Sequence, residues 1–131
     1  MVKIIILPIY MQLRKTGAPQ LIGMNWYSRA HQHQQHAVRK YYSNIIRSHV
    51  NCMEIDEPIK KFKTRYSLYY KNPSSDPSNI VQVMEKLLLD GLQDAGVLTE
   101  DNAKHHVGSD GWDSQQDKEN PRIECFVWEV Y

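Results

Sequence analysis

The chain has 131 residues, which suffices for one domain with a modest hydrophobic core. Its longest apolar stretch near the start, Ile4 to Leu7, is too short for a signal peptide or a membrane span, so we expect no membrane association. Two cysteines, Cys52 and Cys125, imply no disulfide framework and favour the reducing environment of a cytoplasm.

The net charge of +1 hides a strong asymmetry between the two halves of the chain. Through Lys71 there are twelve Lys and Arg against three Asp and Glu, giving +9, and from Asn72 onward four against twelve, giving −8. A basic half suits a polyanionic partner and an acidic half suits a cation site. Equally, the two halves could neutralise each other through salt bridges and keep the protein soluble.

The first half of the chain predicts a strand, a loop and a helix, in that order. Residues 2–10 are β-branched and apolar, which is typical of a buried strand, here interrupted by Pro8. Residues 11–24 contain two glycines and a proline and indicate a loop or hairpin. Residues 30–50 have helical periodicity. The expected apolar stripe of this helix consists of Ala37, Tyr41 and Ile45 with, one step round, Tyr42 and Ile46.

Residues 59–70 alternate as a strand does. One face carries the apolar and aromatic side chains Phe62, Tyr66, Leu68 and Tyr70. The other carries the cations Lys61, Lys63 and Arg65. Such a row of cations can lie along DNA phosphates, or it can simply be a solvated face that protects an edge strand from aggregation.

A helix is predicted over residues 78–94, with Asp76 as its N-cap, Pro77 at its first position and Gly96 just past its end. Its expected core positions are Ile80, Met84, Leu87, Leu88 and Leu92.

The remaining residues predict a loop over 100–102, a short strand over 103–107, a mobile polar connection over 108–121 and a final strand over 123–130. The whole chain, residues 1–131, thus reads as one domain of the α/β (α+β) class, with a mixed β-sheet packed against two main helices.

The second helix carries a polar stripe beside its apolar face. Asn79, Lys86 and Asp90 fall within roughly 40° of one another around the helix axis. Phosphodiester hydrolysis needs such groups, because carboxylates hold Mg²⁺ and a lysine can stabilise charge on the reacting phosphate. An ordinary interpretation is also open, in which Asp76 is only a cap, Lys86 and Asp90 are a surface pair, and Glu100 and Asp101 solvate a loop.

A family resemblance favours the catalytic interpretation. The stretch that carries it runs Asp76-Pro77-Ser78-Asn79-Ile80, then Lys86, then Asp90-Gly91-Leu92, then Gly96-Val97, then Glu100-Asp101-Asn102. This order resembles the core of the RusA family of Holliday junction resolvases, whose pattern is Asp-x-Asp-Asn, a helical lysine, Asp-x-Leu and a closing pair of acids. Upstream, Asn25-Trp26-Tyr27 is similar to the family's segment after the first strand.

The resemblance implies an Mg²⁺- or Mn²⁺-dependent endodeoxyribonuclease that resolves four-way junctions and other branched DNA by paired nicks. It also implies a homodimer, in a bacterial cytoplasm, with the gene in some cases carried by a phage or prophage. The implied metal ligands are Asp76, Asp90 and Asp101, with Asp90 alternatively a structural neighbour. Lys86 would be the catalytic lysine, and Asn79 and Glu100 would support the site. Arg39 and Lys40, on the first helix, would join Lys61, Lys63 and Arg65 in binding the DNA backbone.

Two departures from the family pattern leave other functions open. Ser78 stands where the opening motif has its second acid, and the interval from Asn79 to Lys86 is one helical turn longer than the commoner form. A RusA-like module that binds branched DNA without cutting it is therefore an alternative. A non-catalytic domain whose acidic half binds a basic protein is another.

Overall fold

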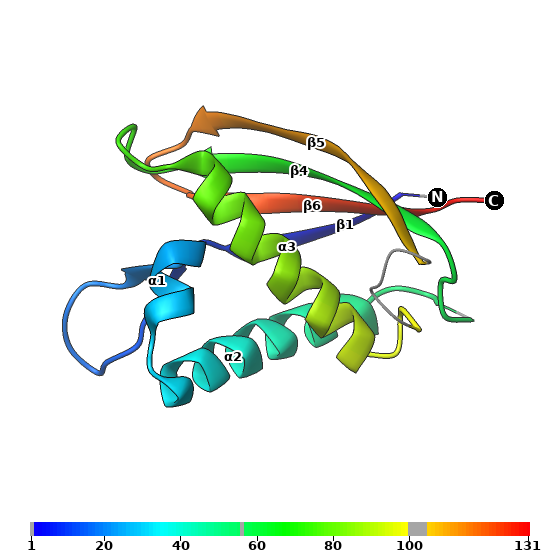
Figure 1. The fold of residues 1–131 in the computed structure, drawn as a ribbon, viewed down its shortest axis with the longest axis horizontal. Coiled ribbons are helices and arrows are strands. Elements are labelled where there is room, and N and C mark those ends of the chain that lie inside the picture. Colours follow the sequence, from blue (N-terminus) through cyan, green and yellow to red (C-terminus); the bar gives the residue numbers. More distant parts are fainter. Residues whose placement is uncertain (1, 56, 100–104) are drawn as a thin grey trace.

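A four-stranded mixed sheet forms one layer of the molecule (Figure 1). Its strands β1 (Lys3–Pro8), β6 (Arg122–Glu129), β4 (Phe62–Tyr70) and β5 (His106–Gln116) lie in the order β1-β6-β4-β5. The pair β4–β5 is parallel, and the other two neighbouring pairs are antiparallel. The computed structural model describes residues 2–55, 57–99 and 105–131.

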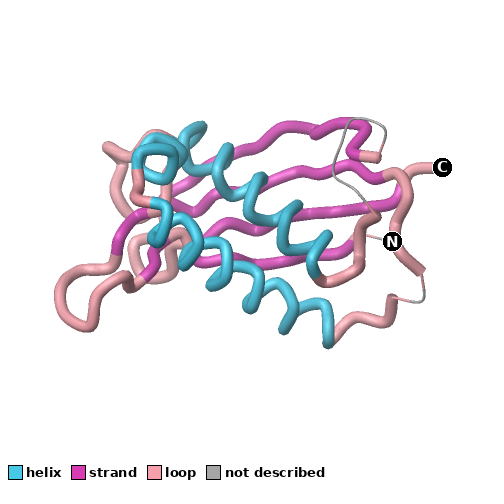
Figure 2. Tube along the Cα trace, turned by 60° about the horizontal axis from the view of Figure 1, so that its bottom comes forward, coloured by secondary structure: helices cyan, strands magenta, loops and turns pink. Residues whose placement is uncertain are grey.

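Three helices in the described part of the chain cover one face of this sheet, and Figure 2 shows them side by side on that face. They are α1 (Met24–Arg29), α2 (Gln32–Asn51) and α3 (Pro77–Asp94). The chain is therefore a single α+β domain with a mixed sheet, which confirms the predicted fold class and its two main helices. The short helix α1 was not predicted, because six residues are too few to show helical periodicity.

The segment between the first strand and α1 folds as a small hairpin, in agreement with the prediction for residues 11–24. Strands β2 (Tyr10–Met11) and β3 (Gln20–Leu21) pair antiparallel. No helix within the described residues is both long and apolar enough to cross a membrane.

The core stripe of α2 contains the predicted Tyr42 and Ile46, but Tyr41 and Ile45 are only half-buried. Val38, Tyr42 and Ile46 are fully buried, whereas Ala37 is exposed. The difference arises because α2 packs against both α3 and the edge of β1. Ile46 fills the space above Gly91 of α3, where a side chain would not fit, and the Tyr42 hydroxyl donates to the Pro8 carbonyl oxygen at 2.6 Å.

Helix α3 agrees with its prediction at both ends. Asp76 is the N-cap and accepts a hydrogen bond from the backbone N–H of Asn79, and Pro77 occupies the first turn. Gly96 ends the helix with a φ of +78°, a conformation that favours glycine. All five predicted core residues of α3 are buried.

The prediction of a mobile connection over 108–121 was wrong. Most of that segment is β5, an eleven-residue edge strand parallel to β4. The strand is nearly all polar because most of its side chains are solvent-exposed, so it lacks the apolar alternation by which strands are recognised. The final strand was correctly predicted and lies inside the sheet as β6, where Trp128 is half-buried.

Candidate active site and nucleic-acid interface

Helix α2 presents cations without any acidic neighbour in its own sequence. Its twenty residues contain Arg39, Lys40 and Arg47 and no Asp or Glu. All three cations are exposed, and none forms an ion pair within the described ranges 2–55, 57–99 and 105–131. Arg39 is partly positioned, because its guanidinium donates to the Tyr27 hydroxyl at 3.0 Å.

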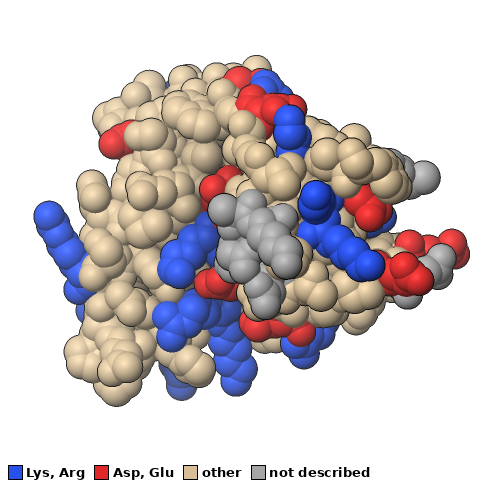
Figure 3. All heavy atoms as spheres, turned by 45° about the vertical axis from the view of Figure 1, so that its right-hand side comes forward, with Lys and Arg blue, Asp and Glu red and all other residues tan. Residues whose placement is uncertain are grey.

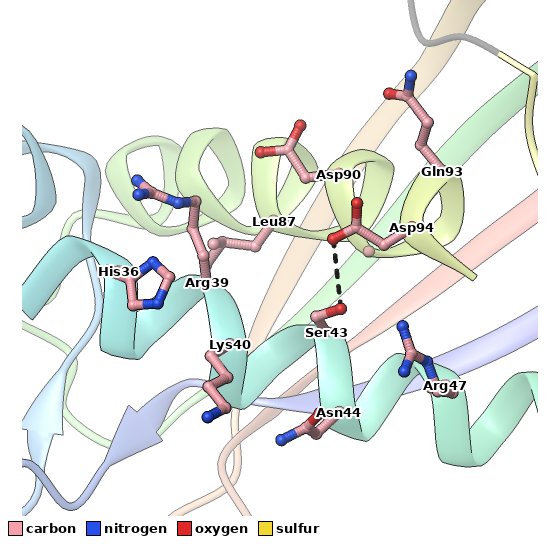
Figure 4. A pocket seen from close by; sticks show the side chains of 11 residues that line it. His36, Arg39, Lys40, Ser43, Asn44, Arg47, Leu87, Asp90, Gln93 and Asp94 are labelled. Carbon is pink, nitrogen blue, oxygen red and sulfur yellow. Dashed lines mark hydrogen bonds between the residues drawn. The ribbon is translucent and has the colours of Figure 1, made fainter. Parts of the chain in front are cut away.

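A groove of about 450 Å³ separates α2 from α3, and Figure 4 shows the residues that line it. The three cations of α2 lie along one side. Asp90 and Asp94 of α3 lie along the other, and Ser43 Oγ bridges the two helices by a 3.4 Å hydrogen bond to Asp94 Oδ2. The tertiary structure thus combines predicted DNA-binding cations with a predicted active-site acid.

Lys86 and Asp90 form the ion pair expected from their i,i+4 spacing, with 3.7 Å between Nζ and Oδ2. Their side chains keep 49% and 35% of their accessible surface. An ion pair this exposed contributes little to stability, so both groups are available to a ligand at low cost.

The other end of α3 holds Asp76, Ser78 and Asn79. Asp76 Oδ1 accepts hydrogen bonds from Ser78 Oγ at 2.9 Å and from the backbone N–H of Asn79 at 3.4 Å. The Asn79 side-chain oxygen accepts from the backbone N–H of Asn25 at 2.8 Å, which joins α3 to α1. Asn79 therefore has a structural role in holding the segment Asn25-Trp26-Tyr27 against α3.

The structure does not bring Asp76 and Asp90 together. They are fourteen residues apart on one helix, which at 1.5 Å per residue separates them by about 21 Å. One metal ion cannot be bound by both. Glu100 and Asp101 lie outside the described residues, and among the described residues there is no group of three or more His, Cys, Asp or Glu that could hold a metal ion.

The cations of β4 are neutralised by β5. Lys63 Nζ lies 3.8 Å from Asp110 Oδ1, and the Arg65 guanidinium donates to Asp113 Oδ2 at 2.9 Å and to the Asp110 carbonyl oxygen at 3.1 Å. Because Phe62, Thr64 and Tyr66 are buried beneath the helices, strand alternation places Lys63 and Arg65 on the uncovered face. Lys61 is exposed and precedes the strand.

The two groups of predicted DNA-binding cations therefore lie on different sides of the molecule. Figure 3 shows several Lys and Arg over the lower part, where α2 lies, with some Asp and Glu among them, and few charges of either sign over the upper part, where the sheet lies. Only the α2 group borders the groove with Asp90.

Several residues of these sites were missed from the sequence. Arg47 follows Lys40 by two helical turns and Asp94 follows Asp90 by one, so helical periodicity could have identified both. Glu85 could not have been identified in this way. Its interaction with Thr64, at 3.5 Å, and through Thr64 with His106, at 3.0 Å, depends on the pairing of α3 with the sheet.

Comparison with known proteins assigns the chain to no family. No family model matches it, and no curated protein matches it at a significant level. The resemblance to the RusA family therefore rests on the motif residues of this chain alone.

Proposed function

We propose that this protein is a metal-dependent endodeoxyribonuclease that acts on Holliday junctions or other branched DNA. The observation that carries the proposal is the groove between α2 and α3, where Arg39, Lys40 and Arg47 lie across from Asp90 and Asp94. The resemblance of the α3 motif to RusA resolvases supports the choice of substrate.

The basic side of the groove suits the DNA backbone. Arginine and lysine on an exposed helix bind phosphate oxygens and release the counterions that surround DNA, which favours binding at low salt. Arg39 is the best-positioned of these cations, because the Tyr27 hydroxyl already holds its guanidinium. A DNA strand bound along α2 would bring its phosphates toward Asp90 and Asp94.

The acidic side of the groove suits a divalent cation. Mg²⁺ is commonly bound by one or two carboxylates together with substrate phosphates and water, so a complete protein cage is not needed. Asp90 and Asp94 lie one turn apart on α3, and the chain leads on from α3 into Glu100 and Asp101. Asp90, Asp94 and Asp101 are therefore the residues we expect to hold the metal, and Asp76 is expected to act chiefly as the helix cap.

The bound metal would supply an activated water and shield the charge on the phosphate. The protein's own side chains would stabilise the transition state and position the DNA. Lys86, exposed beside Asp90, would stabilise the negative charge that develops on the phosphate oxygens in the transition state. The α2 cations would hold the backbone in register with that lysine. Resolving a four-way junction needs two symmetric cuts, so we also propose a homodimer with one such groove per subunit.

A cleavage assay tests this function. A synthetic four-way junction and a linear duplex of the same sequence would be incubated with Mg²⁺, Mn²⁺ or EDTA, and the products separated on a denaturing gel. Metal-dependent paired nicks in the junction alone are expected. Lys86→Ala should reduce turnover by roughly 100-fold with little loss of affinity, whereas Lys63→Ala, on the uncovered sheet face, should change neither.

The other outcomes of the assay are equally informative. Junction binding without any cut would identify a non-cutting module, in keeping with Ser78 at a usual acid position. If the protein neither binds nor cuts the junction, the proposal is overturned.

A further inference from the structure

A second pocket, with both polar and apolar lining, lies on the other flank of α3, between this helix and β5. It has a volume of about 210 Å³ and is distinct from the groove beside α2. Ser78, Gln82 and Glu85 line it from α3. Ser109 and Trp112 line it from β5, and Tyr66 of β4 contributes from beneath the helix.

A bulge in β5 builds this pocket. Thr64 and Tyr66 are two residues apart on β4, but their partners Ser109 and Trp112 are three apart on β5, so β5 contains one extra residue here. In a regular strand Ser109 and Trp112 would point to opposite faces, and the bulge directs both toward α3. Gly111 permits it with a φ of +87°, and its N–H donates to Ser109 Oγ at 3.2 Å.

The hydroxyl of Tyr66 is the unusual group of this pocket. Tyr66 keeps only 1% of its accessible surface, and its hydroxyl lies near Thr64 and Glu85 without forming a hydrogen bond of good geometry to any described residue. Burial, and then the nearby Glu85 carboxylate, raise the pKa of this phenol, so it is neutral and can both donate and accept. A buried polar group without a partner costs free energy, and a bound ligand would remove that cost.

The residues that line the pocket indicate which chemical groups such a ligand would carry. The Glu85 carboxylate accepts hydrogen bonds, so it favours a ligand with a donor group. Trp112, 43% exposed, offers an aromatic face for stacking. The volume corresponds to about seven waters at about 30 Å³ each, which suits a small ring.

We propose that this pocket binds an unstacked nucleobase that carries an exocyclic amino group, as adenine, cytosine and guanine do. The amino group would donate to Glu85, the Tyr66 hydroxyl would bond a ring nitrogen or carbonyl of the base, and Trp112 would stack on the ring. That the base belongs to branched DNA rests on the proposed function. The pocket lies along residues 78–85 of α3 and the groove along residues 87–94, about 14 Å apart along the axis at 1.5 Å per residue, and the helix is about 10–12 Å across. A DNA strand held in the groove would therefore place in the pocket a base that lies a few nucleotides away, not the adjacent one.

Free nucleotides test the pocket without any junction. The full chain would be labelled with ¹⁵N and titrated separately with deoxyadenosine, deoxycytidine and thymidine monophosphates, while its amide and indole N–H signals are followed. We expect the two amino-bearing nucleotides to shift the signals of Ser109 and of the Trp112 indole, roughly tenfold more tightly than thymidine monophosphate, which lacks the amino group. Equal response to all three, no response, or shifts confined to other surfaces would overturn the proposal.

Branched DNA then tests whether the base comes from the substrate. Affinity would be compared for junctions whose branch-point nucleotides are adenine, thymine or abasic. The wild type should prefer adenine by roughly tenfold, and Tyr66→Phe, Glu85→Gln and Trp112→Ala should each reduce that preference while binding of the abasic junction is unchanged. Tyr69→Phe, on the same strand but the opposite face, is the matched control and should keep the preference.

The two arms separate this pocket from the proposed function. Junction binding with no preference among the branch-point bases would reject the pocket as a site for bases of DNA and leave the nuclease proposal standing. Selective nucleotide shifts in a protein that binds no junction would instead support a free-nucleotide ligand and reject the nuclease proposal. Tyr66→Phe removes only the hydroxyl, so the thermal midpoint of this variant should match or exceed that of the wild type. An unchanged midpoint would show that a lost base preference does not come from unfolding.

Discussion

The α2–α3 groove and the uncovered face of the sheet both carry cations, but only the groove leaves them available. On β4, Lys63 and Arg65 are matched by Asp110 and Asp113 of the adjacent strand. On α2, Arg39, Lys40 and Arg47 have no acid in their own helix, and the acids across the groove form no ion pair with them. Two groups of cations that look alike in sequence therefore differ in what they can bind.

The difference shows that availability is a tertiary property. A carboxylate 2.9 Å from a cation brings its own negative charge toward any phosphate that approaches, so the pair attracts DNA less than an unpaired cation does. A cation that faces only solvent binds phosphate and releases counterions without that repulsion. The groove is thus the better candidate for the DNA interface.

The largest effect is expected from the proposed metal ligands. Asp90→Asn and Asp101→Asn should each lower cleavage of a four-way junction by at least about 100-fold, because each removes a proposed metal ligand. Binding of the junction should be kept or tightened, since a negative charge near phosphate is lost. Gel cleavage and mobility-shift assays measure both. Asp113→Asn, on the uncovered face, is the control and should cleave normally.

Removing cations should weaken binding on one face only. Replacing Arg39, Lys40 and Arg47 together by alanine should lower junction affinity and reduce the slope of log affinity against log salt by about 2 to 3, since each phosphate contact contributes about 0.9. Lys63→Ala with Arg65→Ala should leave the slope unchanged within about one. Fluorescence anisotropy at several salt concentrations gives both slopes, and equal losses for the two variants would refute the distinction between the faces.

Two substitutions separate the role of Asp76 as a helix cap from a role of its carboxylate in catalysis. Asp76→Ala should lower the free energy of unfolding by about 1 kcal/mol, because the N–H of Asn79 loses its side-chain acceptor. Asp76→Ser keeps a good capping group, so it should retain stability and, if Asp76 is chiefly a cap, cleavage as well. Urea denaturation and the junction assay are the measurements. A stable Asp76→Ser variant that no longer cuts DNA would make Asp76 catalytic.

The smallest effect is expected at the end of the sheet, where β5 passes into β6. Arg122 hydrogen-bonds Asp117 Oδ2 at 2.9 Å and Glu124 Oε2 at 3.1 Å, and the first of these bonds is the main reason why the pKa of Asp117 is lowered. A lowered carboxyl pKa stabilises the fold above the ordinary pKa of the group, and that contribution is lost as pH falls through the folded-state value. The difference in thermal midpoint between wild type and Asp117→Asn should therefore be constant above about pH 5 and shrink below about pH 4. If the difference in thermal midpoint grew on acidification, the pKa of Asp117 would not be lowered in the folded protein.

The sequence by itself determined the elements whose signals are local. Helix α3 was predicted with its cap, its first-turn proline and its terminal glycine, because capping and helical periodicity depend on residues within one or two turns of each other. The ion pair of Lys86 with Asp90 was predictable for the same reason. Strands β1, β4 and β6 were recognised from their apolar residues, which the core requires.

Only the tertiary structure decided what depends on distant partners. Strand β5 has no apolar pattern, since it is an edge strand held by its pairing with β4, and that same pairing places Asp110 and Asp113 beside Lys63 and Arg65. Packing against Gly91 and Pro8 decided that Tyr42 and Ile46 of the predicted α2 stripe are fully buried and that Tyr41 and Ile45 are not. Asp76 and Asp90 looked like members of one site in the linear motif, but an unbroken helix keeps them about 21 Å apart. Periodicity along one chain segment indicates which side chains share a face, whereas the packing between segments decides which of those faces meet.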